Sequence, residues 1–269
     1  MTGSTLERFL PDEEATTRLG EDLALALRAG DVLALHGDLG AGKTTLARGL
    51  LRALAGDLEM EAPSPTFTLV QVYETRIPVH HFDLYRLSSP SELDELGFDE
   101  ALAQGAVLVE WPEKAGNRLP ENTVHIMLDH RQDGRLARIS GSGPAFERIG
   151  RSLAIRDFLT TAGFPRAARS WFNGDASARS YETIGALGHP PRILMNSPAL
   201  VLGPPVRGGK PYAEIAHTAR TVSAFVALDR ALKANGLCAP KIFARDLEQG
   251  FLLLEHLGSA SFLDATGQP

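Results

Sequence analysis

Residues 37–44 read Gly-Asp-Leu-Gly-Ala-Gly-Lys-Thr, which is the G-x-x-x-x-G-K-[ST] pattern of a phosphate-binding loop. An apolar run precedes it at 31–36, as expected of a buried parallel strand, and residues 44–54 place apolar side chains at helical spacing. Glycines let the loop curl so that backbone N–H groups point into one cup, and the helix adds its positive dipole end. Lys43 then reaches the β- and γ-phosphates, and the Thr44 hydroxyl is placed to ligate Mg²⁺. The stretch therefore predicts a nucleotide site in an α/β domain; a chance glycine-rich turn is the alternative.

The composition suits one large or two modest domains. The 269 residues carry a net charge of −6, so charge alone implies no broad nucleic-acid-binding face, and we expect no DNA partner. Cys238 is the only cysteine, which excludes an intramolecular disulfide and fits a reducing cytoplasm. No apolar run approaches a membrane span, and the N-terminus lacks the pattern of a signal peptide. We expect a cytoplasmic protein without a membrane partner.

Three further segments extend the predicted first domain. Residues 5–10 read as a short strand. Pro11 and the acids after it open a helix, because proline and negative charge are favoured in a first helical turn. Two strands, 123–129 and 135–140, are joined by Gly134 and predict a hairpin at the edge of the sheet.

A loop with two prolines follows the phosphate-loop helix. The prolines of residues 63–67 block a regular helix and leave the hydroxyls of Ser64 and Thr66 exposed, ahead of a predicted strand over 68–73. Beside a bound nucleotide such a loop acts as a switch segment, and elsewhere it is a plain connector. The sequence leaves both interpretations open.

Two later apolar strands each end in a carboxylate. Residues 79–83 end in Asp83, and residues 106–110 end in Glu110. In open α/β sheets ligands bind at the carboxyl ends of the parallel strands, the edge that also carries the phosphate loop. Asp83 either organises Mg²⁺ or caps the turn after it, and Glu110 either holds Mg²⁺ or polarises the attacking water. Trp111 either packs over the site or fills the core.

The order and spacing of these motifs resemble the TsaE family. The matching stretches are Gly37 to Thr44, Ser64 to Phe67, His81-Phe82-Asp83-Leu84-Tyr85-Arg86-Leu87 and Val109-Glu110-Trp111-Pro112-Glu113-Lys114. The resemblance covers about residues 5–148. It implies a small Mg²⁺-dependent ATPase, binding ATP and ADP, that works with the TsaB and TsaD proteins. Together they would make the threonylcarbamoyl modification on the adenosine next to the anticodon of certain tRNAs. TsaD would carry out the transfer, so tRNA would be an indirect partner of the ATPase.

The resemblance also implies roles for individual residues. The residues implied to be catalytic are Lys43, Asp83 and Glu110. Thr44 and Glu110 would hold the metal, and Ser64 and Thr66 would lie in a switch-like loop. The residues implied to bind the nucleotide are Thr16, Asp38, Leu39, Gly40, Ala41, Gly42, Lys43, Thr44, Thr45 and Arg135. No arginine finger stands out, which fits a weak ATPase completed by a partner.

The second half of the chain reads as a separate α+β domain. Residues 141–150 change composition and predict a linker running into a short helix, with another helix beginning at 155–159. A strong helix is predicted over 213–232. Strands are predicted on both sides of Gly174–Ser177, as a hairpin, and at 192–196, 239–243 and 250–258.

This second half resembles the N-terminal lobe of aminoglycoside-phosphotransferase-like kinases, in the branch that phosphorylates N-acetylmuramate and N-acetylglucosamine. The matching stretches, within about residues 152–262, are Gly174 to Ser177, Leu194 to Pro198 and Phe251 to Gly258. The first would lie over ATP phosphates, and Phe251 to His256 would approach the lobe hinge. However, the strand at 193–195 lacks the expected lysine, and no catalytic-loop Asp or Asn follows before Pro269. We therefore expect an accessory domain without phosphotransfer.

Three functions follow from these patterns. The first is an ATPase serving tRNA modification, the second is part of an amino-sugar kinase, and the third is a regulatory module that signals its nucleotide state. The paired strand-end carboxylates favour hydrolysis. The expected fold is α/β: a P-loop NTPase three-layer sheet domain over residues 1–148, followed by an α+β kinase N-lobe-like domain over 149–269.

Overall fold

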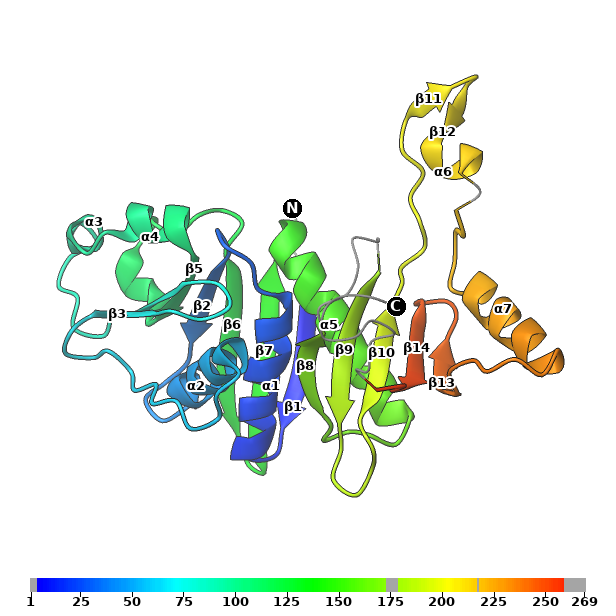
Figure 1. Cartoon of the computed structure of the whole chain (residues 1–269). Helices are drawn as coiled ribbons and strands as arrows, with labels where there is room; N and C mark the ends of the chain where they lie inside the picture. The colour runs from blue at the N-terminus through cyan, green and yellow to red at the C-terminus, as the bar shows by residue number, and fades with distance from the viewer. Residues whose placement is uncertain (1–3, 173–178, 217, 259–269) are drawn as a thin grey trace, which may run out of the picture. The chain divides into compact units, whose positions relative to one another are not determined.

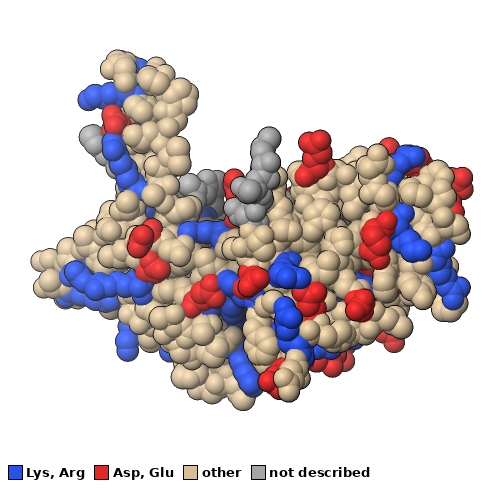
Figure 2. Space-filling model, turned by 180° about the vertical axis from the view of Figure 1, so that it is seen from behind, with Lys and Arg blue, Asp and Glu red and all other residues tan. Residues whose placement is uncertain are grey.

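A computed structural model describes residues 4–172, 179–216 and 218–258 (Figure 1). The chain divides into two compact units, residues 1–156 and residues 157–269. Charged side chains of both signs are spread over the face seen in Figure 2. Among the described residues, the structure contains no helix that is both long and apolar enough to cross a membrane.

The first unit is built on a seven-stranded sheet in the order β1-β7-β6-β2-β5-β4-β3 (Figure 1). The four middle strands β6, β2, β5 and β4 are parallel to one another, and the flanking pairs are antiparallel. This is the mixed α/β architecture that the sequence predicts. The strands are β1 (Ser4–Leu10), β2 (Val32–His36), β3 (Val70–Tyr73), β4 (Val79–Asp83), β5 (Ala106–Glu110), β6 (Val124–Arg131) and β7 (Gly134–Gly141).

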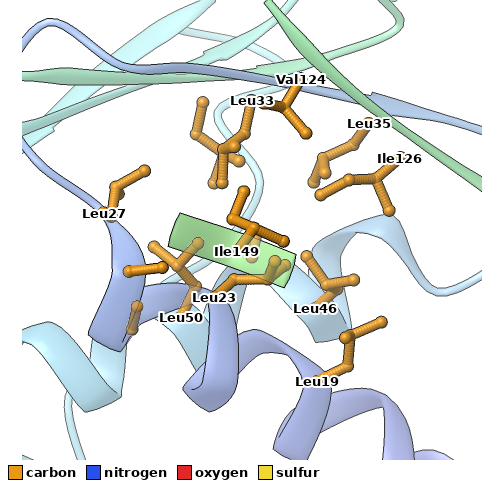
Figure 3. Packing of buried hydrophobic residues seen from close by; sticks show 14 of the residues in the cluster. Leu19, Leu23, Leu27, Leu33, Leu35, Leu46, Leu50, Val124, Ile126 and Ile149 are labelled. Carbon is orange, nitrogen blue, oxygen red and sulfur yellow. The ribbon is translucent and has the colours of Figure 1, made fainter. Parts of the chain in front are cut away.

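One face of this sheet is covered by α1 (Glu13–Ala26), α2 (Lys43–Ala55) and α5 (Gly143–Thr161). Figure 3 shows Leu23 and Leu46 from the first two helices meeting Leu33 and Leu35 of β2, with Ile149 of α5 between them. These side chains are fully buried or nearly so. Because each buried leucine or isoleucine is worth about 1.5–3 kcal/mol, this cluster is a principal source of stability for the unit.

The opposite face of the sheet is covered by two short helices, α3 (Glu92–Glu95) and α4 (Phe98–Gln104). Phe98 packs edge-on against Phe82 of β4, with ring centroids 5.5 Å apart, and Val107 and Val109 of β5 join the same buried cluster. Helices on both faces make the unit three layers, and they explain why β4 and β5 are buried along their whole length.

The first helix begins where the sequence predicts. Asp12 is its N-cap and accepts a hydrogen bond from the Ala15 backbone N–H at 2.7 Å, and two glutamates occupy the first turn. Helices α1 and α2 then approach closely through two glycines. A Cβ on Gly20 would lie 2.4 Å from the Leu46 carbonyl oxygen, and one on Gly49 would lie 2.5 Å from that of Thr17.

Two predictions for the first unit were wrong. The 123–140 hairpin does not lie at the edge of the sheet, because β1 pairs with the outer side of β7. Residues 141–150 are not a linker with a short helix: a single helix, α5, runs from Gly143 to Thr161. Pro144 falls in its first turn, where proline is compatible with a helix start.

The second unit contains a five-stranded antiparallel sheet in the order β13-β14-β10-β9-β8. Helix α7 (Ser223–Ala234) packs on it through Val226, which meets Met195 and Leu252. A separate two-stranded sheet and a short helix, α6 (Tyr212–Ile215), complete the described part. The strands are β8 (Ala168–Phe172), β9 (Ser180–Gly185), β10 (Arg192–Asn196), β11 (Pro205–Arg207), β12 (Lys210–Pro211), β13 (Ile242–Asp246) and β14 (Phe251–Glu255).

The predicted continuous helix over 213–232 was wrong, since α6 ends at Ile215 and α7 begins at Ser223. Thr218, Thr221 and Val222 between them are β-branched and disfavour helix, and the Arg220 carbonyl accepts a hydrogen bond from the Leu200 N–H. The predicted strands on either side of 174–177 are confirmed as the β8–β9 pair. The Gly174–Ser177 segment itself lies outside the described residues.

The close helix approach gives a stability prediction. Gly49→Ala should lower the free energy of unfolding by about 1–3 kcal/mol, because its methyl group has no room against the Thr17 backbone. Gly150→Ala in α5 is the matched control, since its Cβ would make only ordinary contact with Leu6 at 3.6 Å. Urea unfolding of the two variants measures the difference, and equal midpoints would contradict the packing.

Helix α5 gives a second prediction, about where the first folding unit ends. Arg156 pairs with the buried Asp22 through Nε at 2.9 Å and Nη2 at 2.8 Å, and the Ser152 hydroxyl donates to the Asp22 carbonyl. Leu153 is buried in the main core. A fragment of residues 1–148 loses all three contacts, so we expect it to be less stable than 1–156 by about 3 kcal/mol or more.

Urea unfolding of the two fragments, followed by far-ultraviolet circular dichroism, tests this boundary. A cooperative transition at the same midpoint in both fragments would show that α5 beyond 148 contributes nothing to the first unit.

Candidate nucleotide site

A cleft of about 380 Å³ opens at the carboxyl ends of β2, β4 and β5. It brings together most of the side chains that the sequence singled out, from five separate stretches of the chain. Those that line the cleft are Leu39, Gly40, Gly42, Lys43, Thr44, Thr45, Ser64, Thr66, Asp83, Glu110 and Arg135.

The phosphate-binding loop ends at the first turn of α2. Gly42 is the N-cap of this helix at φ 105°, a left-handed conformation that favours glycine, and a Cβ there would approach Arg135 Nε at 3.2 Å. No side chain in the described part of the chain caps α2. Its first-turn N–H groups and positive dipole end are therefore placed to receive an anion, as in other phosphate-binding loops.

Lys43 is almost fully buried, and its ammonium group is held by the loop itself. Its Nζ donates to the Gly37 carbonyl at 2.6 Å and to the Asp38 carbonyl at 3.0 Å. Burial lowers the pKa of Lys43, and the nearby Glu110, Glu113, Asp83 and Asp38 oppose that shift. The loop carbonyls thus fix the side chain across the loop, and such preorganisation reduces the entropy lost on binding a phosphate.

An aromatic ring covers the lysine. Lys43 Nζ lies 3.7 Å from the centroid of the Trp111 ring, within the range of a cation–π interaction. Trp111 adopts φ 59°, ψ 50°, a left-handed conformation that costs a bulky residue about 1–3 kcal/mol. Tyr85 packs beside it, with ring centroids 5.0 Å apart. Of the alternatives for Trp111, the structure favours packing over the site.

Glu110 connects the phosphate-binding loop to the middle of the sheet. The Thr44 hydroxyl lies 3.2 and 3.3 Å from the two carboxylate oxygens of Glu110. On its other side, Glu110 Oε1 lies 3.1 Å from His81 Nε2, and that imidazole is completely buried. The carboxylate is therefore fixed between a hydroxyl on α2 and a ring on β4.

Asp83 binds the proline-containing loop. One carboxylate oxygen, Oδ2, accepts hydrogen bonds from the hydroxyls of Ser64 and Thr66, the latter at 2.8 Å. The other, Oδ1, accepts one from the Tyr85 backbone N–H at 3.0 Å. Asp83 thus caps the turn after β4, as one alternative expects, and also ties the loop to the end of that strand.

Three residues that the resemblance implied as nucleotide ligands do not line the cleft. Thr16 is completely buried and its hydroxyl donates to the Asp12 carbonyl within α1. Ala41 is buried beneath the loop, and Asp38 uses its carbonyl to accept from Lys43. Conversely, Glu13, Tyr85 and Trp111 do line the cleft. Glu13 and Tyr85 were not singled out, and neither was His81, since their positions depend on long-range packing.

A glycine-rich loop between a parallel strand and a helix, facing acids at two neighbouring strand ends, is the arrangement found in phosphate-binding-loop nucleotide proteins. Residues 10–138 match the family model described as threonylcarbamoyl adenosine biosynthesis protein TsaE. The chain belongs to this family, and the matched residues lie within the first compact unit.

Individual relatives agree with the family match. The tRNA threonylcarbamoyladenosine biosynthesis protein TsaE of Rickettsia felis is 41% identical over 122 residues, which are 45% of this chain and 71% of that protein. The protein of the same name from Haemophilus influenzae is 37% identical over 138 residues, 49% of this chain and 86% of that one. The crystal structure of Bacillus subtilis YdiB is similar with a TM-score of 0.50 and 30% identity, covering 58% of this chain and 99% of that one.

The position of Lys43 predicts its contribution to nucleotide binding. Lys43→Ala removes the ammonium group from the loop and should weaken binding of a fluorescent ADP analogue by about tenfold or more, as loss of a charged hydrogen bond of roughly 1.5–3 kcal/mol implies. Lys114→Ala, at an exposed lysine that does not line the cleft, is the matched control and should leave affinity unchanged. Equal affinity in the Lys43 variant and the control would contradict the site.

Proposed function

We propose that the chain is a Mg²⁺-dependent ATPase needed for the threonylcarbamoyl modification of the adenosine next to the anticodon in tRNA. The observation that carries this proposal is the convergence of Lys43, Thr44 and Glu110 in one cleft of a chain that belongs to the TsaE family. The curated relatives named above are tRNA threonylcarbamoyladenosine biosynthesis proteins.

The loop supplies what a nucleoside triphosphate requires. The N–H groups at the start of α2 and the Lys43 ammonium group would neutralise and orient the phosphate chain. Arg135 and Leu39 also line the cleft. Since Lys43 already spans the loop, its phosphate contacts form by exchange of carbonyl partners and not by ordering of a free side chain.

The oxygen atoms of Thr44 and Glu110 fit Mg²⁺. Both are hard donors, and they lie 3.2 Å apart on two elements that face the same cleft. The described residues contain no cluster of three or more His, Cys, Asp or Glu that could hold a metal by themselves. Mg²⁺ usually takes one or two protein ligands together with phosphate and water, so this small donor set suits it. When bound, the ion would neutralise charge on the phosphate oxygens.

The loop containing Ser64 and Thr66 is proposed as the switch segment. Both hydroxyls bond to Asp83, and both residues line the cleft. A ligand that draws either hydroxyl toward itself would release the loop from the strand end, so the position of the loop would report nucleotide state. A plain connector would not need two hydroxyls on one buried carboxylate.

Partner proteins fit the exposed rim of the cleft. Phe67 is 82% exposed and Leu39 is 80% exposed, and both lie in loops that carry cleft residues. We propose that TsaB- and TsaD-type proteins are the partners, that tRNA is reached through them for the modification step, and that the setting is the cytoplasm.

The second unit is proposed as a kinase N-lobe-like module with an accessory role. Its five antiparallel strands and the packed helix α7 support the resemblance. The alternative of an amino-sugar kinase is not favoured, because the family match and the named relatives concern tRNA modification, and β10 carries no lysine.

Glu110 provides the test of hydrolysis. Glu110→Gln keeps the size of the side chain but removes its charge beside Thr44, and should lower the rate of phosphate release from ATP by about 10- to 100-fold and raise the Mg²⁺ concentration needed. Glu121→Gln, at an exposed glutamate, is the matched control. Release of labelled phosphate is measured with and without the partner proteins.

Thermal unfolding of both variants shows whether the fold is intact, since Glu110 is buried. Unchanged hydrolysis in both Glu110→Gln and Lys43→Ala would remove the site assignment. Label transferred to N-acetylmuramate would instead support the kinase alternative.

A further inference from the structure

A second cleft, of about 300 Å³, lies between α7 and β13 in the second unit. Four cationic side chains line it: Arg230 and Lys233 from α7, Arg245 from β13, and Lys241 just before that strand. Asp229 is the one acidic residue among those that line this basic cleft.

Sequence spacing explains how the cations converge. Val226, Asp229, Arg230 and Lys233 stand at i, i+3, i+4 and i+7, so they share one face of α7. Val226 is buried in the core of the unit, which directs this face toward the sheet. On the strand side, exposure alternates, and Arg245 is exposed along with Lys241 just before the strand.

The positive charge of the basic cleft is only partly neutralised. Asp229 accepts from Lys233 Nζ at 2.9 and 3.1 Å, and Lys233 also donates to the Pro240 carbonyl. Within the described ranges, Arg230 and Arg245 form no ion pair or side-chain hydrogen bond. In Figure 2, Lys and Arg side chains are seen at the left of the view, the side on which α7 and β13 lie.

The second unit is positively charged, although the chain as a whole is negatively charged. The full chain has a net charge of −6, whereas residues 157–269 contain 11 Lys and Arg against 9 Asp and Glu. The excess of positive charge therefore belongs to the second unit, and four of its cations meet at one cleft. An asymmetry of this kind is typical of a unit that meets a polyanion.

We propose that the basic cleft between α7 and β13 binds the phosphate backbone of RNA, so that the second unit holds the tRNA whose modification the first unit supports. This inference rests on the function proposed above. Arg230 and Arg245 are exposed and have no fixed hydrogen-bond partner among the described residues, which suits contact with a phosphate backbone. A site for one small anion would instead hold its donors in place in advance. The long, flexible side chains on both walls accommodate successive phosphates along a strand.

The proposal predicts a strong dependence on salt. Each phosphate neutralised by Lys or Arg releases condensed counterions, so the logarithm of affinity falls linearly with the logarithm of salt concentration, with a slope of about −0.7 to −0.9 per contact. Removing two of the four cations should therefore reduce the steepness of the slope by roughly 1–2.

The test uses the full chain and fluorescently labelled tRNA, with anisotropy measured between about 50 and 200 mM KCl. R230E/R245E, and the milder R230Q/R245Q, should weaken binding by about tenfold or more and flatten the salt slope. The matched control is R207E/K210E on β11 and β12, which makes the same change in net charge in the same unit and should change affinity by less than about twofold.

Three outcomes would overturn the proposal: no tRNA binding by the unmodified chain, equal losses in R230E/R245E and R207E/K210E, or displacement of tRNA by millimolar inorganic phosphate, which would indicate a small-anion site. Circular dichroism confirms that each variant is folded. Partner-stimulated phosphate release separates the two proposals. Loss of RNA binding with intact hydrolysis in R230E/R245E supports the basic cleft. Absent hydrolysis with intact RNA binding in the unmodified chain would count against the proposed ATPase and not against the basic cleft.

Discussion

Parallel pairing of β4, β5 and β2 is the constraint on which the site depends. In this register Asp83 lies opposite Glu110, and Glu110 lies opposite Leu35, two residues before the phosphate-binding loop. Parallel strands end at one edge of a sheet, so the acids at the ends of β4 and β5 lie beside the loop that follows β2. The hydrogen bonds of Thr44 and His81 to Glu110 follow from this register, because the loop connects the end of β2 to the start of α2, and His81 precedes Asp83 by two residues on β4.

Burying these charges is costly unless they satisfy one another. Lys43, Asp83 and Glu110 are each at most 5% exposed, yet each has partners: loop carbonyls for the lysine, hydroxyls for Asp83, and a hydroxyl and an imidazole for Glu110. The left-handed backbone of Trp111 adds strain at the same place. The hydrophobic cluster around Leu23 packs α2 against β2, the two elements that the loop joins (Figure 3). Such strain and buried charge concentrate at functional sites.

The sequence predicts most of the first unit because its signals are local. The phosphate-binding loop, the apolar strands and their terminal acids each read from a few neighbouring residues. What it misses depends on contacts between distant segments. His81 reaches Glu110 as a hydrogen-bond partner only because β4 pairs with β5. Thr16 is buried because α1 packs against α2. The sequence of residues 141–150 predicts a linker, because it does not show that Arg156, later in α5, bonds to Asp22 of α1.

The central claim is that hydrolysis in this cleft sustains tRNA modification. The most direct measurement is the amount of threonylcarbamoyladenosine formed per TsaD-type partner on tRNA, by mass spectrometry, with ATP, Mg²⁺ and the partner proteins, in the presence and absence of this chain. The account predicts many modified tRNAs per partner with the chain, and about one per partner without it or with Lys43→Ala. Equal yields in all three reactions would contradict it.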